Sequence, residues 1–137
     1  MSSVLFRLCA TGCVGLLLVL VTCGCQNGKY KIVPVEGKIS FTDGKSLPAG
    51  TRLIFNPGEG GIGTATAVTA PDGSFKVAHV SGGTGAEIGK YSVQLAAPEG
   101  DTGSFFKIIP REYCDGGLLH AEVKEGMAPL DFKVKKR

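Results

Sequence analysis

The chain has 137 residues, of which 43% are hydrophobic and 20% are charged, and it contains 21 Gly and 7 Pro. This length allows one compact domain with a modest core and excludes a multidomain enzyme. Lys and Arg number 15 against 12 Asp and Glu, and because the basic residues are scattered along the chain, no nucleic-acid partner is expected. The two His and the lack of Trp leave few groups for catalysis or ring stacking.

The N-terminal segment has the pattern of a secretory signal. Residues 1–7 carry one positive side chain, Arg7, and residues 8–21 are apolar or small throughout. A charged start followed by a short apolar run is typical of such signals. A membrane-spanning helix needs roughly 20 apolar residues, so this segment is expected to be cleaved rather than retained.

The apolar run ends in Cys23-Gly24-Cys25, which resembles the processing site of bacterial lipoproteins. In that family small residues precede a cysteine that is diacylated and becomes the mature N-terminus. Cys25 has Gly24 before it, whereas the alternative, Cys23, has Leu20 where Leu is usual. The resemblance implies a lipid anchor in the cell envelope, and because Gln26 instead of Asp follows Cys25, an outer-membrane location. An ordinary signal peptide with incidental cysteines is the competing interpretation.

These features divide the chain into a lipoprotein signal peptide at residues 1–24, a lipidated tether at 25–32 and one domain at 33–137. Three cysteines then leave with the signal and one is acylated, so Cys114 has no disulfide partner. If the other cysteine is lipidated instead, Cys25 and Cys114 could pair. No cysteine spacing fits a zinc site, and neither a metal nor another cofactor is expected.

Behind the tether the hydrophobic pattern changes to the two-residue period of half-buried strands. Seven strands are predicted, at residues 33–41, 51–55, 64–69, 75–77, 89–95, 119–123 and 130–134. Turn signals such as Asp43-Gly44 separate them. The apolar stretch 97–117 lacks this period and is expected to pack along the domain as an extended crossing. The pattern predicts an all-β, seven-stranded antiparallel β-sandwich.

The phase of the alternation also predicts which side chains form the core, because successive strand residues point to opposite faces. The predicted core residues are Val35, Ile39, Phe41, Leu53, Phe55, Phe75, Val77, Tyr91, Val93, Leu95, Leu130, Phe132 and Val134. Residues 89–95 show the cleanest alternation and are expected to form a central strand.

Three segments resemble carboxypeptidase regulatory-like, transthyretin-like sandwich domains. Residues 35–51 look like the opening of these domains, Asp72-Gly73-Ser74-Phe75 like their second signature, and Gly89-Lys90-Tyr91-Ser92-Val93 like the third. The resemblance spans residues 35–134 and extends to small bacterial lipoproteins built from this single domain. It implies a transthyretin-like or Ig-like sandwich with a non-catalytic, accessory role.

A hydrolase activity is not expected from this resemblance or from the candidate residues. Transthyretin-like hydrolases of purine breakdown carry a Tyr-Arg-Gly-Ser tail, whereas this chain ends in residues 131–137, Asp-Phe-Lys-Val-Lys-Lys-Arg. A nucleophilic mechanism needs a nucleophile, a base and an orienting acid. His79, His120 and Cys114 are instead predicted to be structural or solvated.

The remaining polar clusters also have structural interpretations. The loop acids do not form the Asp-x-Asp-x-Asp pattern of a calcium loop and are predicted to be turn formers; they are Asp43, Asp72, Glu99, Asp101 and Asp115. The glycine runs at residues 60–63 and 82–85 lack the Lys and the following helix of a phosphate loop. The basic residues 133–137 are predicted to be a solvated terminus, with contact to acidic headgroups as the alternative.

Three functional hypotheses follow, from different classes. The first is a non-catalytic, lipid-anchored envelope protein that acts as a structural or protein-interaction module, with the membrane and an envelope protein as partners. The alternative is a carbohydrate or cell-wall-polymer binding module, which an exposed aromatic row on one sheet would favour. The third is a small enzyme, which a His, an acid and a thiol converging in one pocket would favour.

Overall fold

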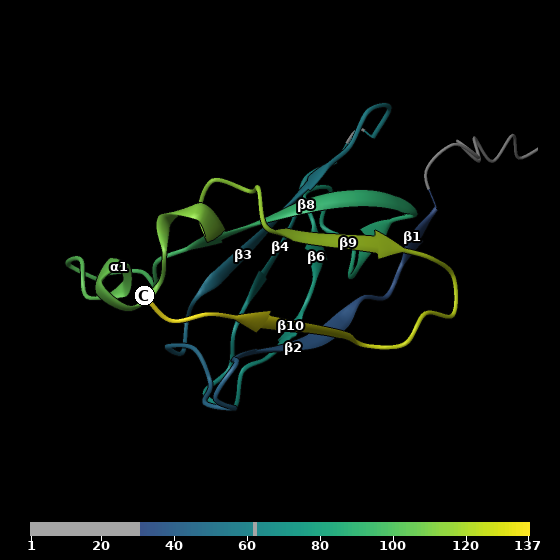
Figure 1. Cartoon of the computed structure of the whole chain (residues 1–137). Helices are drawn as coiled ribbons and strands as arrows, with labels where there is room; N and C mark the ends of the chain where they lie inside the picture. Colours follow the sequence, from purple (N-terminus) through teal and green to yellow (C-terminus); the bar gives the residue numbers. More distant parts are fainter. Residues whose placement is uncertain (1–30, 62) are drawn as a thin grey trace, which may run out of the picture.

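The computed structural model describes residues 31–61 and 63–137, in which ten strands and two short helices form an all-β fold (Figure 1). The strands are β1 (Ile32–Val33), β2 (Glu36–Phe41), β3 (Arg52–Pro57), β4 (Ala65–Val68), β5 (Ser74–Lys76), β6 (Ala78–His79), β7 (Ala86–Glu87), β8 (Gly89–Ala96), β9 (Leu119–Val123) and β10 (Leu130–Val134). The predicted signal peptide and both candidate lipidation sites, Cys23 and Cys25, lie outside the described residues. No helix in the described part is long and apolar enough to span a membrane.

The strands form three open sheets, an arrangement consistent with a β-sandwich. One sheet has the order β6-β4-β3-β8-β9, a second has the order β10-β2-β5, and β1 pairs with β7. Each of the seven predicted segments contains a strand of the two larger sheets. The additional strands β1, β6 and β7 are two residues long each, too short to give a periodic signal in the sequence.

The prediction that all pairs are antiparallel is wrong for one pair. β10 runs parallel to β2, with Leu130 opposite Gly37 and Val134 opposite Phe41, whereas the other pairs are antiparallel. β9 belongs to the five-stranded sheet and β10 to the three-stranded sheet. The connection between them therefore crosses from one sheet to the other. Because β9 and β10 do not form a hairpin, β10 is not required to run antiparallel to its neighbour.

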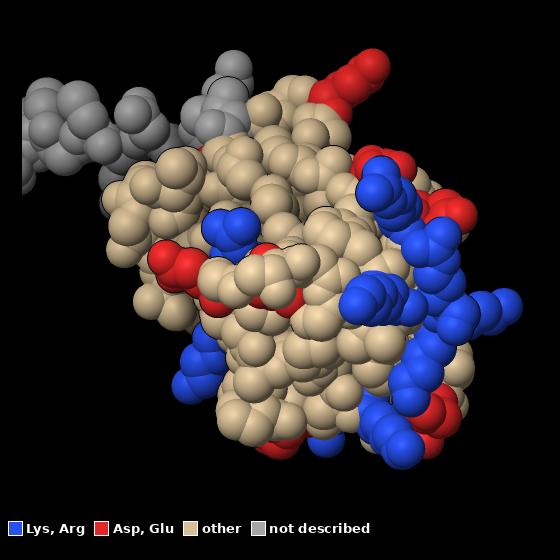
Figure 2. All heavy atoms as spheres, turned by 90° about the vertical axis from the view of Figure 1, so that its left-hand side faces the viewer, with Lys and Arg blue, Asp and Glu red and all other residues tan. Residues whose placement is uncertain are grey.

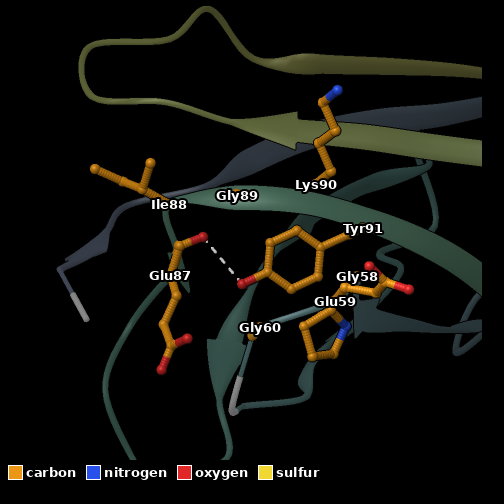
Figure 3. Close-up of a pocket in the computed structure, with 10 residues that line it drawn as sticks. Gly58, Glu59, Gly60, Glu87, Ile88, Gly89, Lys90 and Tyr91 are labelled. Carbon is orange, nitrogen blue, oxygen red and sulfur yellow. Dashed lines mark hydrogen bonds between the residues drawn. The ribbon is translucent and has the colours of Figure 1, made fainter. Parts of the chain in front are cut away.

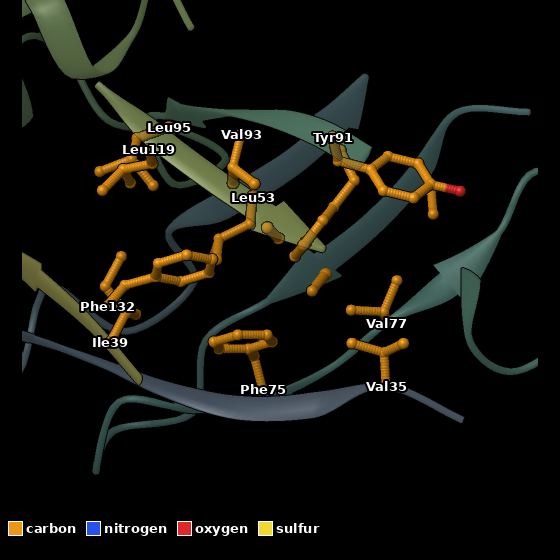
Figure 4. Close-up of a cluster of buried hydrophobic side chains, with 14 of the residues drawn as sticks. Val35, Ile39, Leu53, Phe75, Val77, Tyr91, Val93, Leu95, Leu119 and Phe132 are labelled. Atoms are coloured by element: carbon orange, nitrogen blue, oxygen red, sulfur yellow. The ribbon is translucent and has the colours of Figure 1, made fainter. Parts of the chain in front are cut away.

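Side chains from the two larger sheets meet in one core (Figure 4). The ring centroid of Phe55, on β3, lies 6.3 Å from that of Phe75 on β5 and 6.5 Å from that of Phe132 on β10. All predicted core residues are buried except Leu130, which is partly buried at the margin of the cluster. The alternation therefore predicted the phase of every long strand correctly.

The stretch 97–117 packs against the core as predicted but is not extended. It contains the single helical turn α1 (Phe105–Ile108) and the 3₁₀ turn η1 (Arg111–Tyr113). Phe105, Ile109 and Tyr113 are buried and attach these turns to the core, although the backbone is extended at Ile109 and Pro110 between α1 and η1. Two isolated turns are too short for a helical period to be recognised in the sequence, which explains the error.

Candidate functional site

The two histidines lie in different environments. His120 is exposed on the outer face of β9, whereas His79 is buried at the end of β6, with 6% of its side chain exposed. The exposure of His120 and the burial of His79 are compatible with a solvated and a structural role, which stay predictions. His79 is the more informative of the two, because a buried ionisable group needs partners.

The partners of His79 are Ser81 and Glu87. Nδ1 lies 2.7 Å from Ser81 Oγ and accepts a hydrogen bond from the Ser81 N–H at 3.2 Å. Since Nδ1 is an acceptor, the neutral ring carries its proton on Nε2, which lies 3.4 Å from the Glu87 carboxylate outside hydrogen-bond geometry. Glu87, on β7, is as deeply buried as His79, with 7% of its side chain exposed. The pair thus joins two edge elements inside the protein.

Gly63 lies directly against the ring of His79. A Cβ atom built on Gly63 would overlap Nε2 and Cε1 of His79, so only a residue without a side chain fits there. The same close approach leaves no room for a ligand on Nε2. The His79–Glu87 pair is therefore a structural contact, and within the described residues no group of three or more His, Cys, Asp or Glu could hold a metal.

A hollow of about 520 Å³ lies next to Glu87 (Figure 3). Its lining residues are Pro57, Gly58, Glu59, Gly60, Gly61, Glu87, Ile88, Gly89, Lys90 and Tyr91. The Tyr91 hydroxyl donates a hydrogen bond of 2.9 Å to the Glu87 carbonyl oxygen, while the Glu87 carboxylate points away from Tyr91. Burial of the phenol, helped by the negative charge of Glu87, raises the pKa of Tyr91 above its usual value. Tyr91 therefore stays protonated and serves as a structural donor.

Cys114 lies apart from the His79–Glu87 pair. It ends η1, which packs on β8, whereas β6 is an edge strand separated from β8 by β4 and β3. The partly buried thiol points to the Pro110 carbonyl oxygen at 4.0 Å. Cys114 therefore does not form one site with the His79–Glu87 pair in the described structure.

Cys114 is expected to react slowly with alkylating reagents. Burial, and then the nearby Asp115 carboxylate, raise the pKa of the thiol, which outweighs the opposing effect of Arg111. Only the thiolate reacts, so iodoacetamide should label Cys114 more slowly at neutral pH than an unstructured cysteine peptide, and faster as the pH rises. Labelling at the peptide rate would contradict this environment. Cys114→Ser should leave folding independent of reductant.

The predicted turn-forming role holds for three of the loop acids. Asp43 accepts a hydrogen bond from the Lys45 N–H at 3.0 Å, Asp72 accepts one from the Ser74 N–H at 2.9 Å, and Asp101 caps α1 by accepting from the Phe105 N–H at 2.8 Å. Side-chain hydrogen bonds, followed by these backbone bonds, lower the pKa of all three carboxyls. These three acids therefore stabilise turns of the chain.

The outer faces of the two larger sheets differ in charge. Five of the side chains that point outward from the three-stranded sheet are charged, namely Glu36, Lys38, Lys76, Asp131 and Lys133, and Ser40 and Ser74 lie on the same face. The central outward positions of the five-stranded sheet are Ile54, Asn56, Thr66, Ser92, Gln94 and His120, none of them Asp, Glu, Lys or Arg. We call these six residues the neutral face. Part of it, with Lys90 and Glu122, lines a second hollow of about 540 Å³.

The neutral face is ordered in two rows across the sheet. Thr66, Ile54 and Gln94 lie opposite one another on β4, β3 and β8. Asn56, Ser92 and His120 form the next row, on β3, β8 and β9. Ile54, Asn56, Ser92 and Gln94 are only partly exposed. The segment that follows η1 lies against this face at one edge, where a Cβ atom built on Gly116 would lie 2.8 Å from Gln94 Cγ. The strand phases indicated these positions, but their shared lack of charge was not recognised in the sequence.

The basic side chains of the C-terminal segment are exposed, in agreement with the predicted solvated terminus, and the segment is also attached to the domain. The Arg137 N–H donates to the Ile108 carbonyl oxygen at 3.0 Å, and its guanidinium donates to the Phe106 carbonyl oxygen at 3.2 Å. Lys136 pairs with Asp43 at 2.6 Å and lies 4.7 Å from the centre of the Phe41 ring. Lys and Arg side chains consequently form a band on this end of the molecule (Figure 2).

Comparisons of this chain with protein-family models, with curated proteins and with solved structures found no match.

Proposed function

We propose that this chain is a bacterial envelope lipoprotein, anchored through Cys25 or Cys23, whose transthyretin-like sandwich domain acts as a non-catalytic protein-interaction module. The signal-like N-terminus and the family resemblance supply the anchor, the export and the class of domain. The structure contributes the candidate contact surface. The neutral face is the observation that carries the proposal.

The non-catalytic part of the proposal rests on how the reactive groups are used. His79 is enclosed by Gly63 and engaged by Ser81, so it cannot reach a substrate. The Cys114 thiol has a raised pKa and lies on a different element. These are properties of structural side chains, whereas a catalytic thiol needs a lowered pKa and a base within reach.

The interaction part rests on the contrast between two outer faces of one domain. Solvated sheet faces are polar, and that of the three-stranded sheet is largely charged, whereas the centre of the five-stranded sheet carries no charged side chain. Depletion of charged residues in the centre is one compositional feature of the core of a protein interface. The neutral face is flanked by Arg52 on one side and by Lys90 and Glu122 on the other. This arrangement of a neutral centre and a charged rim fits a protein partner.

Site-specific photo-crosslinking in intact cells tests this surface. A crosslinking residue at Ile54 or Gln94 should give a discrete adduct with an envelope protein, because both side chains lie in the centre of the neutral face. The same residue at Lys38, on the charged outer face, is the matched control and should give none. Equal adducts at both faces, or none at Ile54 and Gln94, would exclude the neutral face as the contact surface.

A carbohydrate or cell-wall-polymer binding module is the second candidate. The hollow lined by Asn56, Ser92 and His120 favours it, since these side chains can bond to sugar hydroxyls. The neutral face as defined carries no Phe or Tyr on which a sugar ring could stack. Adducts with glycan instead of protein in the crosslinking experiment would favour this candidate.

A further inference from the structure

Four basic residues from two segments that are distant in sequence lie around α1 at one end of the molecule. Lys107 belongs to α1 and Arg111 to η1. Arg137 is bonded to two carbonyl groups of α1, and the Lys135 N–H donates to the Tyr113 hydroxyl at 3.1 Å. We call Lys107, Arg111, Lys135 and Arg137 the cationic end; Figure 2 views the molecule from this side.

These four side chains are not neutralised within the described structure. The ion pairs of neighbouring basic residues are Lys133 with Asp131 and Lys136 with Asp43. In the part of the chain that the structure describes, no acidic group lies within ion-pair distance of the cationic end. The end therefore presents positive charge that is available to an external partner.

Two apolar side chains are exposed among these cations. Phe106 and Ile108, both on α1, are each 37% exposed, while Phe105 between α1 and the core is buried. The Arg111 guanidinium lies 5.9 Å from the centre of the Phe106 ring. Exposed Phe and Ile next to Lys and Arg on a single turn form an amphipathic tip.

We propose that the cationic end docks on an anionic lipid surface. Phe106 and Ile108 can enter the boundary between headgroups and acyl chains, and the long Lys and Arg side chains can reach the phosphates beside them. A soluble acidic polymer would use the charges but not the apolar tip. The presence of both groups on one turn therefore favours lipid.

The cationic end lies far from the point at which the chain enters the domain. β1 is at the opposite end of the fold from the C-terminus and α1 (Figure 1). A chain held at its N-terminus can thus turn this end toward a second surface. The lipid contact is separate from the neutral face and does not depend on the proposed protein partner.

Co-sedimentation of the full chain with vesicles tests the proposal. Vesicles of phosphatidylcholine alone measure binding through the N-terminal segment, and vesicles that also contain phosphatidylglycerol add the anionic component. The full chain should bind the anionic vesicles more strongly than the vesicles of phosphatidylcholine alone. This difference in binding, called the excess below, should fall as salt is raised. The double variant K107Q/R111Q should lose the excess by about tenfold or more.

Two pairs of matched variants complete the test. The first pair shows whether binding depends on the cationic end or only on net charge, and the second shows whether the ligand is a lipid surface or another polyanion. R52Q/K76Q removes two exposed charges from elsewhere on the domain and should keep the excess. F106S should reduce the excess, whereas V68S, which alters another exposed apolar residue, should not. Equal losses for the two charge variants would overturn the proposal. A loss with K107Q/R111Q but not with F106S would also overturn it, in favour of an acidic polymer.

Discussion

Val93→Asp is expected to unfold the domain or prevent its accumulation. Val93 is 0% exposed on β8, between Phe55 of β3 and Leu119 of β9. A carboxylate at this position would lose its hydration without gaining a partner, which would cost about 5 kcal/mol. The whole stability of such a domain is roughly 5–15 kcal/mol. Thermal or urea unfolding monitored by circular dichroism measures the loss.

Gln94→Asp is the matched control for this substitution. Gln94 is the next residue on the same strand, but it lies on the partly exposed outer face opposite Ile54. Its replacement should cost about 1 kcal/mol or less, because the new carboxylate remains in contact with water. If both variants melted alike, the register of β8 and the assignment of its core face would be wrong.

His79→Ala is expected to lower the free energy of unfolding by about 1–3 kcal/mol, because it leaves buried polar groups without the ring that they face. The substitution leaves the Glu87 carboxylate buried, with the ring that faced it at 3.4 Å removed. It also removes the partner of Ser81. Urea unfolding at neutral pH measures the change, with the wild-type chain as reference.

The double variant H79L/E87L separates the pair from the packing around it. Replacing both partners by apolar residues removes the buried carboxylate together with the ring that faces it, so the double variant should be more stable than H79A alone. E87L completes a double-mutant cycle with H79L, and the two residues should be coupled by about 1 kcal/mol or more. Additive effects would show that the contact between them contributes nothing to stability.

The sequence was sufficient for the strands and most of the core because one physical constraint determines both. A strand that is buried on one side must alternate, so Tyr91, Val93 and Leu95 could be placed in the core without knowledge of their neighbours. The two-residue alternation that buries Phe75 and Val77 also reaches His79, so the burial of His79 could have been predicted from it. Its partner Glu87 lies on a two-residue strand that has no periodic signal.

Strand pairing and surface clusters could not be predicted in the same way. Alternation shows which face of β10 is buried but not that its neighbour is the parallel strand β2. The cationic end combines residues of α1 and η1 with Arg137, which lies 30 positions after Lys107 in the sequence. Their proximity depends on hydrogen bonds between the C-terminal segment and α1. The sequence contained the charges but not their tertiary arrangement.

Anchoring in the envelope is the premise of the proposed function, and mass spectrometry of the mature protein purified from its membrane tests it most directly. The N-terminal peptide should begin at Cys25, or at Cys23, and carry the mass of a diacylglyceryl group. An unmodified mature N-terminus, or a chain that retains the apolar residues 8–21, would contradict the lipid anchor and with it the proposed function.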